Sequence, residues 1–222
     1  MYIIGLIDDS PIEKKKIRLT IKESKYKNQE IQFKDYVLDE DDKLFERLAK
    51  EIIKDIVNGD ITGLIVDYKL IIKTNKLEGT DILKQIKDVI PEFPVIILTN
   101  VVDDSKKPNF VDPDKVYEKK MFLNLDNSET NNIQILMLDN IFRNMERYIN
   151  SRDTLEIELN NLKQEIINEG LETNVFDELI KIETELSKYY PIQQTELDKA
   201  LDSRKLKQTI ELLDKVDEIL GR

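Results

Sequence analysis

Five side chains that could take part in chemistry stand where short apolar segments of the chain end: Asp8, Asp9, Asp67, Thr99 and Lys119. Three carboxylates held close together raise one another's pKa unless a cation lies among them. The hydroxyl could donate a hydrogen bond to a phosphoryl oxygen, and the ammonium would place a positive charge beside that group. These residue types therefore predict a cation site next to a place where a phosphoryl group binds.

The cation must be one that oxygen ligands hold. The sequence contains no cysteine and no histidine, which excludes disulfides, thiolate and imidazole metal sites, and histidine general bases. Mg²⁺ takes carboxylate and carbonyl oxygens at about 2.1 Å and keeps water molecules that an incoming phosphoryl group can replace. Mg²⁺ is therefore the predicted cofactor.

The apolar segments alternate with helical patterns over about the first 123 residues, which predicts α/β structure with a parallel sheet covered on both faces. The predicted strands are residues 2–7, 31–37, 63–66, 94–98 and 115–117. The first predicted helix begins at about Pro11 with Ser10 as its N-cap, and two more cover about 42–57 and 81–90. Ligands of such a sheet bind at the carboxyl ends of its strands. The five side chains should therefore meet at one edge.

Beyond about residue 130 only helical patterns are present. Large residues recur at alternating intervals of three and four, interrupted by Arg152: Leu138, Ile141, Met145, Tyr148, Leu155, Leu159, Leu162 and Ile166. This stripe predicts one continuous helix over about 131–169, ended by Gly170. A second helix, ended by Pro191, carries its own apolar face: Val175, Leu179, Ile182, Leu186 and Tyr189. Shorter helices are predicted over 193–220. An intramolecular hairpin and a dimeric coiled coil account for the stripe equally well.

The overall charge argues against two classes of partner. The net charge is −11, whereas nucleic acids and anionic lipids require clustered Lys and Arg. Residues 150–222 carry ten Lys and Arg against seventeen Asp and Glu, and no basic recognition helix stands out. No segment approaches the roughly 18 apolar residues of a membrane span, and residues 1–10 do not fit a signal peptide. We expect a cytoplasmic protein that binds neither nucleic acid nor membrane.

Four segments, taken in order, resemble the response-regulator receiver domain of two-component signalling. IIGLIDDS resembles its first strand and acidic pair, and GLIVDYKL with EGTDILKQIK resembles the phosphoacceptor segment and the following helix. FPVIILTN is similar to the strand that ends in Ser or Thr, and VYEKKMF to the strand that ends in lysine. The match covers roughly residues 1–123. It implies a flavodoxin-like, doubly wound sheet of five parallel strands in the order 2-1-3-4-5.

The resemblance also implies a role for each side chain. Asp67 would accept the phosphoryl group, and Thr99 and Lys119 would contact it. The ligands of Mg²⁺ would be Asp8, Asp9, Asp67 and the backbone carbonyl of Lys69.

Simpler roles compete with these. Asp8 and Asp9 could instead serve simply as caps of the helix that follows them. Lys120 is a rival for Lys119; we prefer Lys119, because choosing Lys120 would push Glu118 and Lys119 toward the interior at a desolvation cost.

Three features depart from the family pattern. Asn100 follows Thr99 where receivers have a small residue, and its larger side chain could shield the phosphoryl group and slow hydrolysis. The loop between Tyr68 and Thr80 is longer than usual. No fourth helix is evident in residues 101–114, which contain two prolines.

We therefore expect a receiver domain over 1–125 and an α-helical module over 126–222, built as a coiled coil or helical bundle, for dimerisation or partner binding. The expected partners are a sensor histidine kinase or phosphotransfer protein, because the chain has no histidine of its own, and a downstream protein. A homodimer through the helical module is a further expectation.

We do not expect a turnover enzyme, beyond self-dephosphorylation. A phosphatase of the haloacid-dehalogenase type would need a second aspartate where Lys69 stands. The alternative function is a degenerate receiver that is never phosphorylated and acts as a dimeric adaptor or scaffold.

Overall fold

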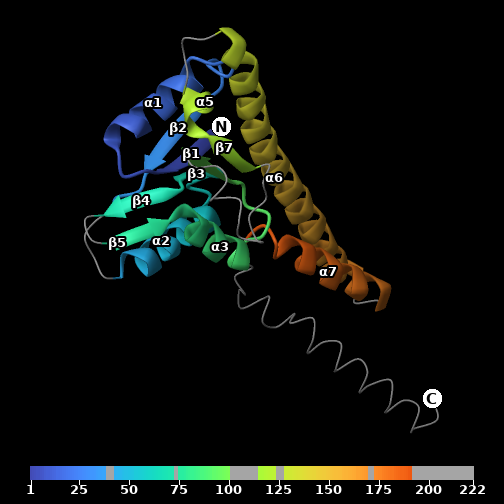
Figure 1. The fold of residues 1–222 in the computed structure, drawn as a ribbon. Helices are drawn as coiled ribbons and strands as arrows, with labels where there is room; N and C mark the ends of the chain where they lie inside the picture. The colour runs from blue at the N-terminus through green and yellow to red at the C-terminus, as the bar shows by residue number, and fades with distance from the viewer. Residues whose placement is uncertain (39–42, 73–74, 101–114, 124–127, 170–172, 192–222) are drawn as a thin grey trace, which may run out of the picture. The chain divides into compact units, whose positions relative to one another are not determined.

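The computed structural model describes residues 1–38, 43–72, 75–100, 115–123, 128–169 and 173–191 (Figure 1). The chain divides into two compact units, Met1–Asn150 and Ser151–Arg222. The predicted helices over 193–220, and the question of a fourth receiver helix in 101–114, fall outside the described residues.

A five-stranded parallel sheet forms the centre of the first unit. Its strands are β1 (Tyr2–Ile7), β2 (Ile31–Asp35), β3 (Gly63–Asp67), β6 (Val95–Thr99) and β7 (Val116–Glu118). They lie in the order β2-β1-β3-β6-β7, which is 2-1-3-4-5 when only these strands are counted. Every neighbouring pair is parallel. Apolar runs such as Leu64-Ile65-Val66 are buried because helices cover both faces of the sheet.

Helices cover the two faces as the alternating pattern predicts. Among the described residues, the helices of the first unit are α1 (Pro11–Lys22), α2 (Leu44–Asn58), α3 (Gly79–Val89), α5 (Lys119–Leu123) and the first part of α6 (Ser128–Glu169). Apolar residues of α1 and α6 share one core with β1, β3 and β6, and α2 and α3 lie side by side (Figure 1). Ser10 caps α1, with Pro11 in the first turn. The predicted fold class, a doubly wound parallel sheet with a helical extension, is confirmed.

The segment after Asp67 differs from expectation. The sequence comparison with receivers predicts a long loop between Tyr68 and Thr80, but the chain forms an antiparallel pair, β4 (Lys69–Ile72) and β5 (Asn75–Glu78). The apolar and β-branched sequence Leu70-Ile71-Ile72 favours a strand. The lysines that surround this short segment obscure the preference in the sequence.

The long helix α6 contributes to two separate cores. Leu138, Ile141 and Met145 pack in the core of the first unit. The ring of Tyr26 stacks on Phe142 at 3.9 Å between centroids, and the Tyr26 hydroxyl donates to Asp139 at 2.9 Å. The first half of the predicted stripe therefore covers the five-stranded sheet.

The second unit contains the end of α6 and α7 (Thr173–Leu186). Leu159, Leu162 and Ile166 are buried against apolar residues of α7: Val175, Leu179, Ile182 and Leu186. Within one chain, the end of α6 and α7 therefore pack on each other as in the predicted hairpin; the dimeric coiled coil stays a prediction. The helix α7 ends at Leu186, before the predicted stop at Pro191, and residues 187–189 form turns.

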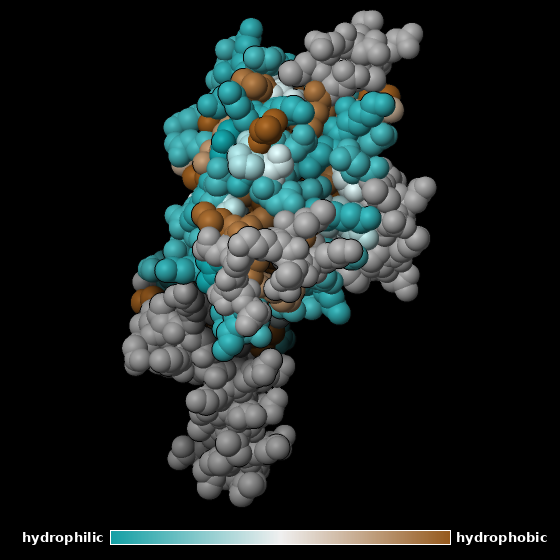
Figure 2. Space-filling model, turned by 60° about the vertical axis from the view of Figure 1, so that its left-hand side comes forward, coloured by the Kyte–Doolittle hydropathy of each residue, from teal (hydrophilic) through white to brown (hydrophobic). Residues whose placement is uncertain are grey.

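Figure 2 shows a mainly hydrophilic face on which hydrophobic residues form small separate areas. Within the described residues, no helix combines the length and the apolar character needed to cross a bilayer.

Candidate functional site

The five predicted side chains stand at the carboxyl ends of neighbouring parallel strands. Asp8 and Asp9 follow β1, Asp67 is the last residue of β3, Thr99 is the last residue of β6, and Lys119 follows β7. Asp67 is paired in register with Leu98, the residue before Thr99, and Thr99 is paired with Glu118, the residue before Lys119. The sheet therefore brings all five to one edge, as the sequence predicts.

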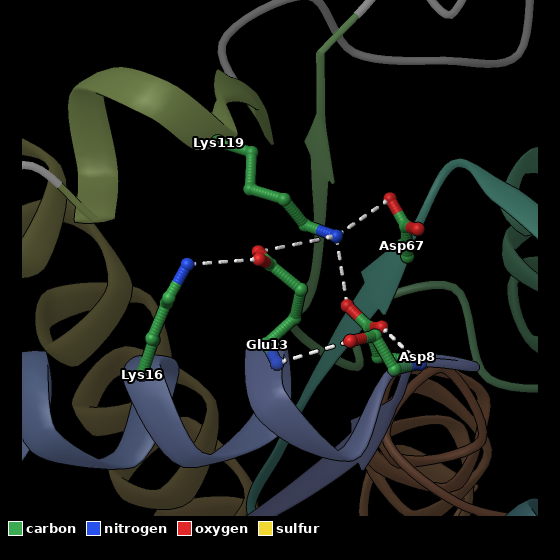
Figure 3. Close-up of polar contacts among 6 residues, drawn as sticks. Asp8, Glu13, Lys16, Asp67 and Lys119 are labelled. Carbon is green, nitrogen blue, oxygen red and sulfur yellow. Dashed lines mark hydrogen bonds and ion pairs between the residues drawn. The ribbon is translucent and has the colours of Figure 1, made fainter.

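Lys119 connects two of the acids. Its ammonium Nζ lies 2.8 Å from Asp8 Oδ2 and 3.2 Å from Asp67 Oδ1 (Figure 3). The Lys119 side chain is only 5% exposed, whereas its neighbour Lys120 is exposed. Lys119, rather than Lys120, is thus the lysine at this edge.

Three acids lie close enough together to share one ion. Asp8, Asp9 and Asp67 each offer a carboxylate oxygen, and these atoms all lie within 4.8 Å of one another. Asp8 is buried, Asp67 is half-buried and Asp9 is exposed, so the group opens to solvent on one side. A single lysine cannot neutralise three carboxylates, and hard oxygen donors are the ligands that Mg²⁺ prefers. The residues present therefore fit a magnesium ion.

Asp8 is held in place by two hydrogen bonds. Its Oδ1 accepts from the backbone N–H of Ser10 at 2.8 Å, and its Oδ2 accepts from Lys119. The helix cap itself is Ser10, whose Oγ accepts from the backbone N–H of Glu13 at 3.3 Å. Asp8 thus faces the site, and the side chain that caps α1 is that of Ser10.

The pKa values reflect the crowding of charge. Burial raises the pKa of Asp67 to about 6; Lys119 opposes this increase and Asp8 adds to it. Burial lowers the pKa of Lys119, but its hydrogen bonds to Asp8 and Asp67 and their charges more than offset that effect, so the pKa is raised overall. At neutral pH the site consequently holds a charged lysine and an Asp67 that is destabilised as an anion.

Lys69 and Thr99 occupy the places that the sequence assigned to them. Lys69 begins β4, two residues after Asp67, and its side chain is exposed, with Nζ 5.8 Å from the ring centroid of Tyr68. The metal-ligand role of its carbonyl stays a prediction. Thr99 is buried, and Asn100 beside it is exposed.

Gly79 is a site residue that sequence reasoning missed. It begins α3, and its backbone N–H donates to the carbonyl of Tyr68 at 2.7 Å. A Cβ added here would lie 2.9 Å from Val66 Cγ1 and would overlap the backbone carbonyl oxygen of Asp67. Only glycine allows α3 to approach Asp67 this closely. The segment EGTDILKQIK contains this residue, but the sequence alone did not show what it contacts.

Glu13 is a second residue that sequence reasoning missed. It lies in the first turn of α1, and its Oε2 is 3.9 Å from Lys119 Nζ (Figure 3). Its spacing from Ser10 is that of a capping box, which would direct its carboxylate to the helix terminus rather than to a lysine more than 100 residues later in the chain.

No family model and no curated protein matches the chain. Among solved structures, the chain is similar to the RcsB response regulator of Salmonella typhimurium, which is described for its conformational dynamism in DNA interaction. The identity is 13%, the match covers 90% of this chain and 98% of that chain, and the TM-score is 0.37. A likeness this weak supports no statement about the function of this chain. The strand order, the helices on both faces and the helical part that follows fit a receiver domain with a helical C-terminal part.

Proposed function

We propose that the first unit is a receiver domain that accepts a phosphoryl group on Asp67. The observation that carries the proposal is the position of Lys119 Nζ, 2.8 Å from Asp8 and 3.2 Å from Asp67, beside three acids that could hold one ion. A metal-binding acidic group without a lysine would bind a cation and little else. A lysine in contact with the nucleophile provides a counter-charge for an anionic group that arrives there.

The carboxylate of Asp67 is the nucleophile in this proposal. One of its oxygens attacks the phosphorus of a phosphohistidine on a partner protein; the new O–P bond forms while the P–N bond breaks, and the imidazole leaves with a proton from solvent. Lys119 and Thr99 donate hydrogen bonds to phosphoryl oxygens. Bound to Asp8, Asp9, Asp67 and the Lys69 carbonyl, Mg²⁺ would supply charge neutralisation. Water later hydrolyses the acyl phosphate, which restores Asp67 and releases inorganic phosphate.

The test uses the full chain with Mg²⁺ and a small phosphodonor. Incubation with acetyl phosphate is expected to add the mass of one phosphoryl group, and beryllofluoride is expected to shift the amide NMR signals of β3 and α5. The matched variant Asp67→Asn should show neither effect. An unmodified wild type, or equal modification of Asp67→Asn, would contradict the proposal and leave the degenerate receiver as the better description.

We also propose that the signal leaves through protein contacts of the helical module rather than through DNA. The excess of acids over bases in residues 150–222 supports this, because phosphate contacts need Lys and Arg. The chain would act on no external substrate; its partners would be a histidine kinase or phosphotransfer protein and a downstream protein, with a homodimer as one form of output. Sedimentation of the phosphorylated and unphosphorylated chains tests the homodimer.

Anisotropy of a labelled DNA duplex at low salt tests the absence of DNA binding. We expect no binding by either form of the chain. Binding that weakens steeply as salt is added would overturn this part of the proposal.

A further inference from the structure

Glu13 lies beside the acidic group without belonging to it. Its Oε2 is 3.9 Å from Lys119 Nζ, and its Oε1 is 3.2 Å from Lys16 Nζ (Figure 3). Among the described residues, the acids whose oxygens could share one ion are Asp8, Asp9 and Asp67. Glu13 therefore pairs with the ammonium of Lys119 and lies outside the group of acids that could hold an ion.

The local structure explains why this carboxylate reaches Lys119. In a capping box, the glutamate three residues after the N-cap accepts a hydrogen bond from the backbone N–H of the N-cap. Here that N–H, of Ser10, donates to Asp8 at 2.8 Å instead, while the Ser10 hydroxyl still accepts from the Glu13 backbone. Because Asp8 takes the bond, the Glu13 carboxylate extends between two lysines, as Figure 3 shows.

We propose that Glu13 is a positioning residue that limits how readily Lys119 reaches a phosphoryl group on Asp67, and that Lys16 weakens this limit. The inference rests on the proposed function. Phosphoryl oxygens must compete with every acceptor that already holds the Lys119 ammonium. A carboxylate 3.9 Å away attracts that ammonium and repels an incoming anion. Lys16, which is half exposed, partly neutralises the same carboxylate from the solvent side.

The proposal predicts effects of opposite sign for two neighbouring residues. In the full chain with Mg²⁺, Glu13→Gln should lower the apparent dissociation constant for beryllofluoride by about threefold, the size expected of a partly exposed ion pair. Lys16→Gln should raise it, because the carboxylate is then left to Lys119. The double variant should bind like Glu13→Gln, since Lys16 acts only through Glu13.

Glu23→Gln is the matched control. It makes the same change in net charge on the same helix, but Glu23 is the exposed C-cap of α1, about 15 Å along the helix axis from Glu13. We expect wild-type affinity. Because Glu13 is 26% exposed, neither Glu13→Gln nor a second variant, Glu13→Ala, should unfold the chain, and both should tighten binding.

The outcomes separate this inference from the proposed function. A wild type that binds no beryllofluoride removes both. A wild type that binds it, with Glu13→Gln indistinguishable from Glu23→Gln, overturns the role of Glu13 and leaves the receiver function in place. Tighter binding by Lys16→Gln would likewise overturn the inference, because the sign would then be wrong.

Discussion

Folding buries the carboxylate of Asp67, and this burial is unfavourable while the carboxylate is charged. Its side chain is 14% exposed and its pKa is raised to about 6 by burial, with Lys119 opposing and Asp8 adding to the effect. A pKa raised in the folded state means that the native carboxyl holds its proton better than the unfolded chain does. The fold is therefore favoured while Asp67 is protonated, and it loses that contribution as pH rises through about 6.

This linkage predicts that Asp67→Asn stabilises the protein at neutral pH. The amide carries no charge to desolvate, so the free energy of unfolding should rise by about 1–2 kcal/mol at about pH 7.5. The gain should fall by more than half at about pH 4.5, where the wild-type carboxyl is itself largely protonated. Urea denaturation without Mg²⁺ at the two pH values measures it. Asp9→Asn, at an exposed position, is the control and should change little; a gain for Asp67→Asn that does not depend on pH would contradict the explanation.

Lys119, in contrast, is expected to stabilise the folded state. Asp8 is 2% exposed at its side chain, and removal of the ammonium would leave it and Asp67 without their common counter-charge. We expect Lys119→Met to lower the free energy of unfolding by about 2–4 kcal/mol in the absence of divalent ions. Excess Mg²⁺ should restore part of this loss, because an ion that binds only the native site stabilises it.

Thermal and urea unfolding with EDTA or Mg²⁺ measure both effects of Lys119→Met. The neighbouring variant Lys120→Met, at an exposed position, should stay within about 0.5 kcal/mol of the wild type. A loss for Lys119→Met that Mg²⁺ leaves unchanged would show that packing, rather than charge, is what the lysine supplies.

At the scale of elements, β3, the antiparallel pair β4–β5 and α3 form one assembly around Asp67. The Tyr68 backbone N–H donates to Leu98 at 3.1 Å, and the Tyr68 carbonyl accepts from Gly79 at 2.7 Å. These two bonds fix the chain immediately after Asp67. The close approach of α3 depends on the missing side chain of Gly79.

Gly79→Ala is therefore expected to disturb both fold and site. The added methyl overlaps the Asp67 carbonyl, which cannot move without moving the carboxylate, so we expect a loss of about 2 kcal/mol or more and a weakened beryllofluoride response. Gly59→Ala is the comparison. Gly59 has a φ of 75°, and no atom of the described residues lies within 4 Å of the position that a Cβ would take. This variant should cost about 1 kcal/mol of backbone strain and leave the response intact. Equal responses in the two variants would contradict the packing argument.

The elements themselves could largely be predicted from the sequence. Continuous apolar runs such as Leu64-Ile65-Val66 are read correctly because both faces of the strand are buried, and Ser10 is read correctly because capping is local. The antiparallel pair β4–β5 after Asp67 was missed because its lysines obscured the strand preference of a short apolar segment. Glu13 and Gly79 were missed for another reason. What Glu13 contacts depends on how α1 packs beside Lys119, more than 100 residues later, and what Gly79 contacts depends on how closely α3 approaches the end of β3.

At the scale of the molecule, α6 joins two units with separate cores. Its first part is held on the first unit by the stacking of Phe142 on Tyr26, by the edge contact of Phe142 with Tyr2 of β1, and by a hydrogen bond from the Tyr2 hydroxyl to Glu146 at 2.7 Å. The side chain of Gln134 donates to the carbonyl of Phe122 at 2.8 Å, which ties α6 to the short helix that begins at Lys119. The second part packs on α7. Lys119 and α6 are thus joined through one short helix and one hydrogen bond.

Because the two cores share no residue, a cavity in one should leave the other folded. Leu186 is fully buried between α7 and α6, and Leu186→Ala should destabilise the second unit by about 3 kcal/mol. In hydrogen exchange, the amides of α7 and of residues 155–169 should lose protection while those of β1, β3 and β6 keep theirs. Ile167→Ala, at a position 59% exposed, should leave both units unchanged. Loss of protection in β1 alongside α7 would show instead that the chain opens as one cooperative unit, and that the second unit contributes to the stability of the first.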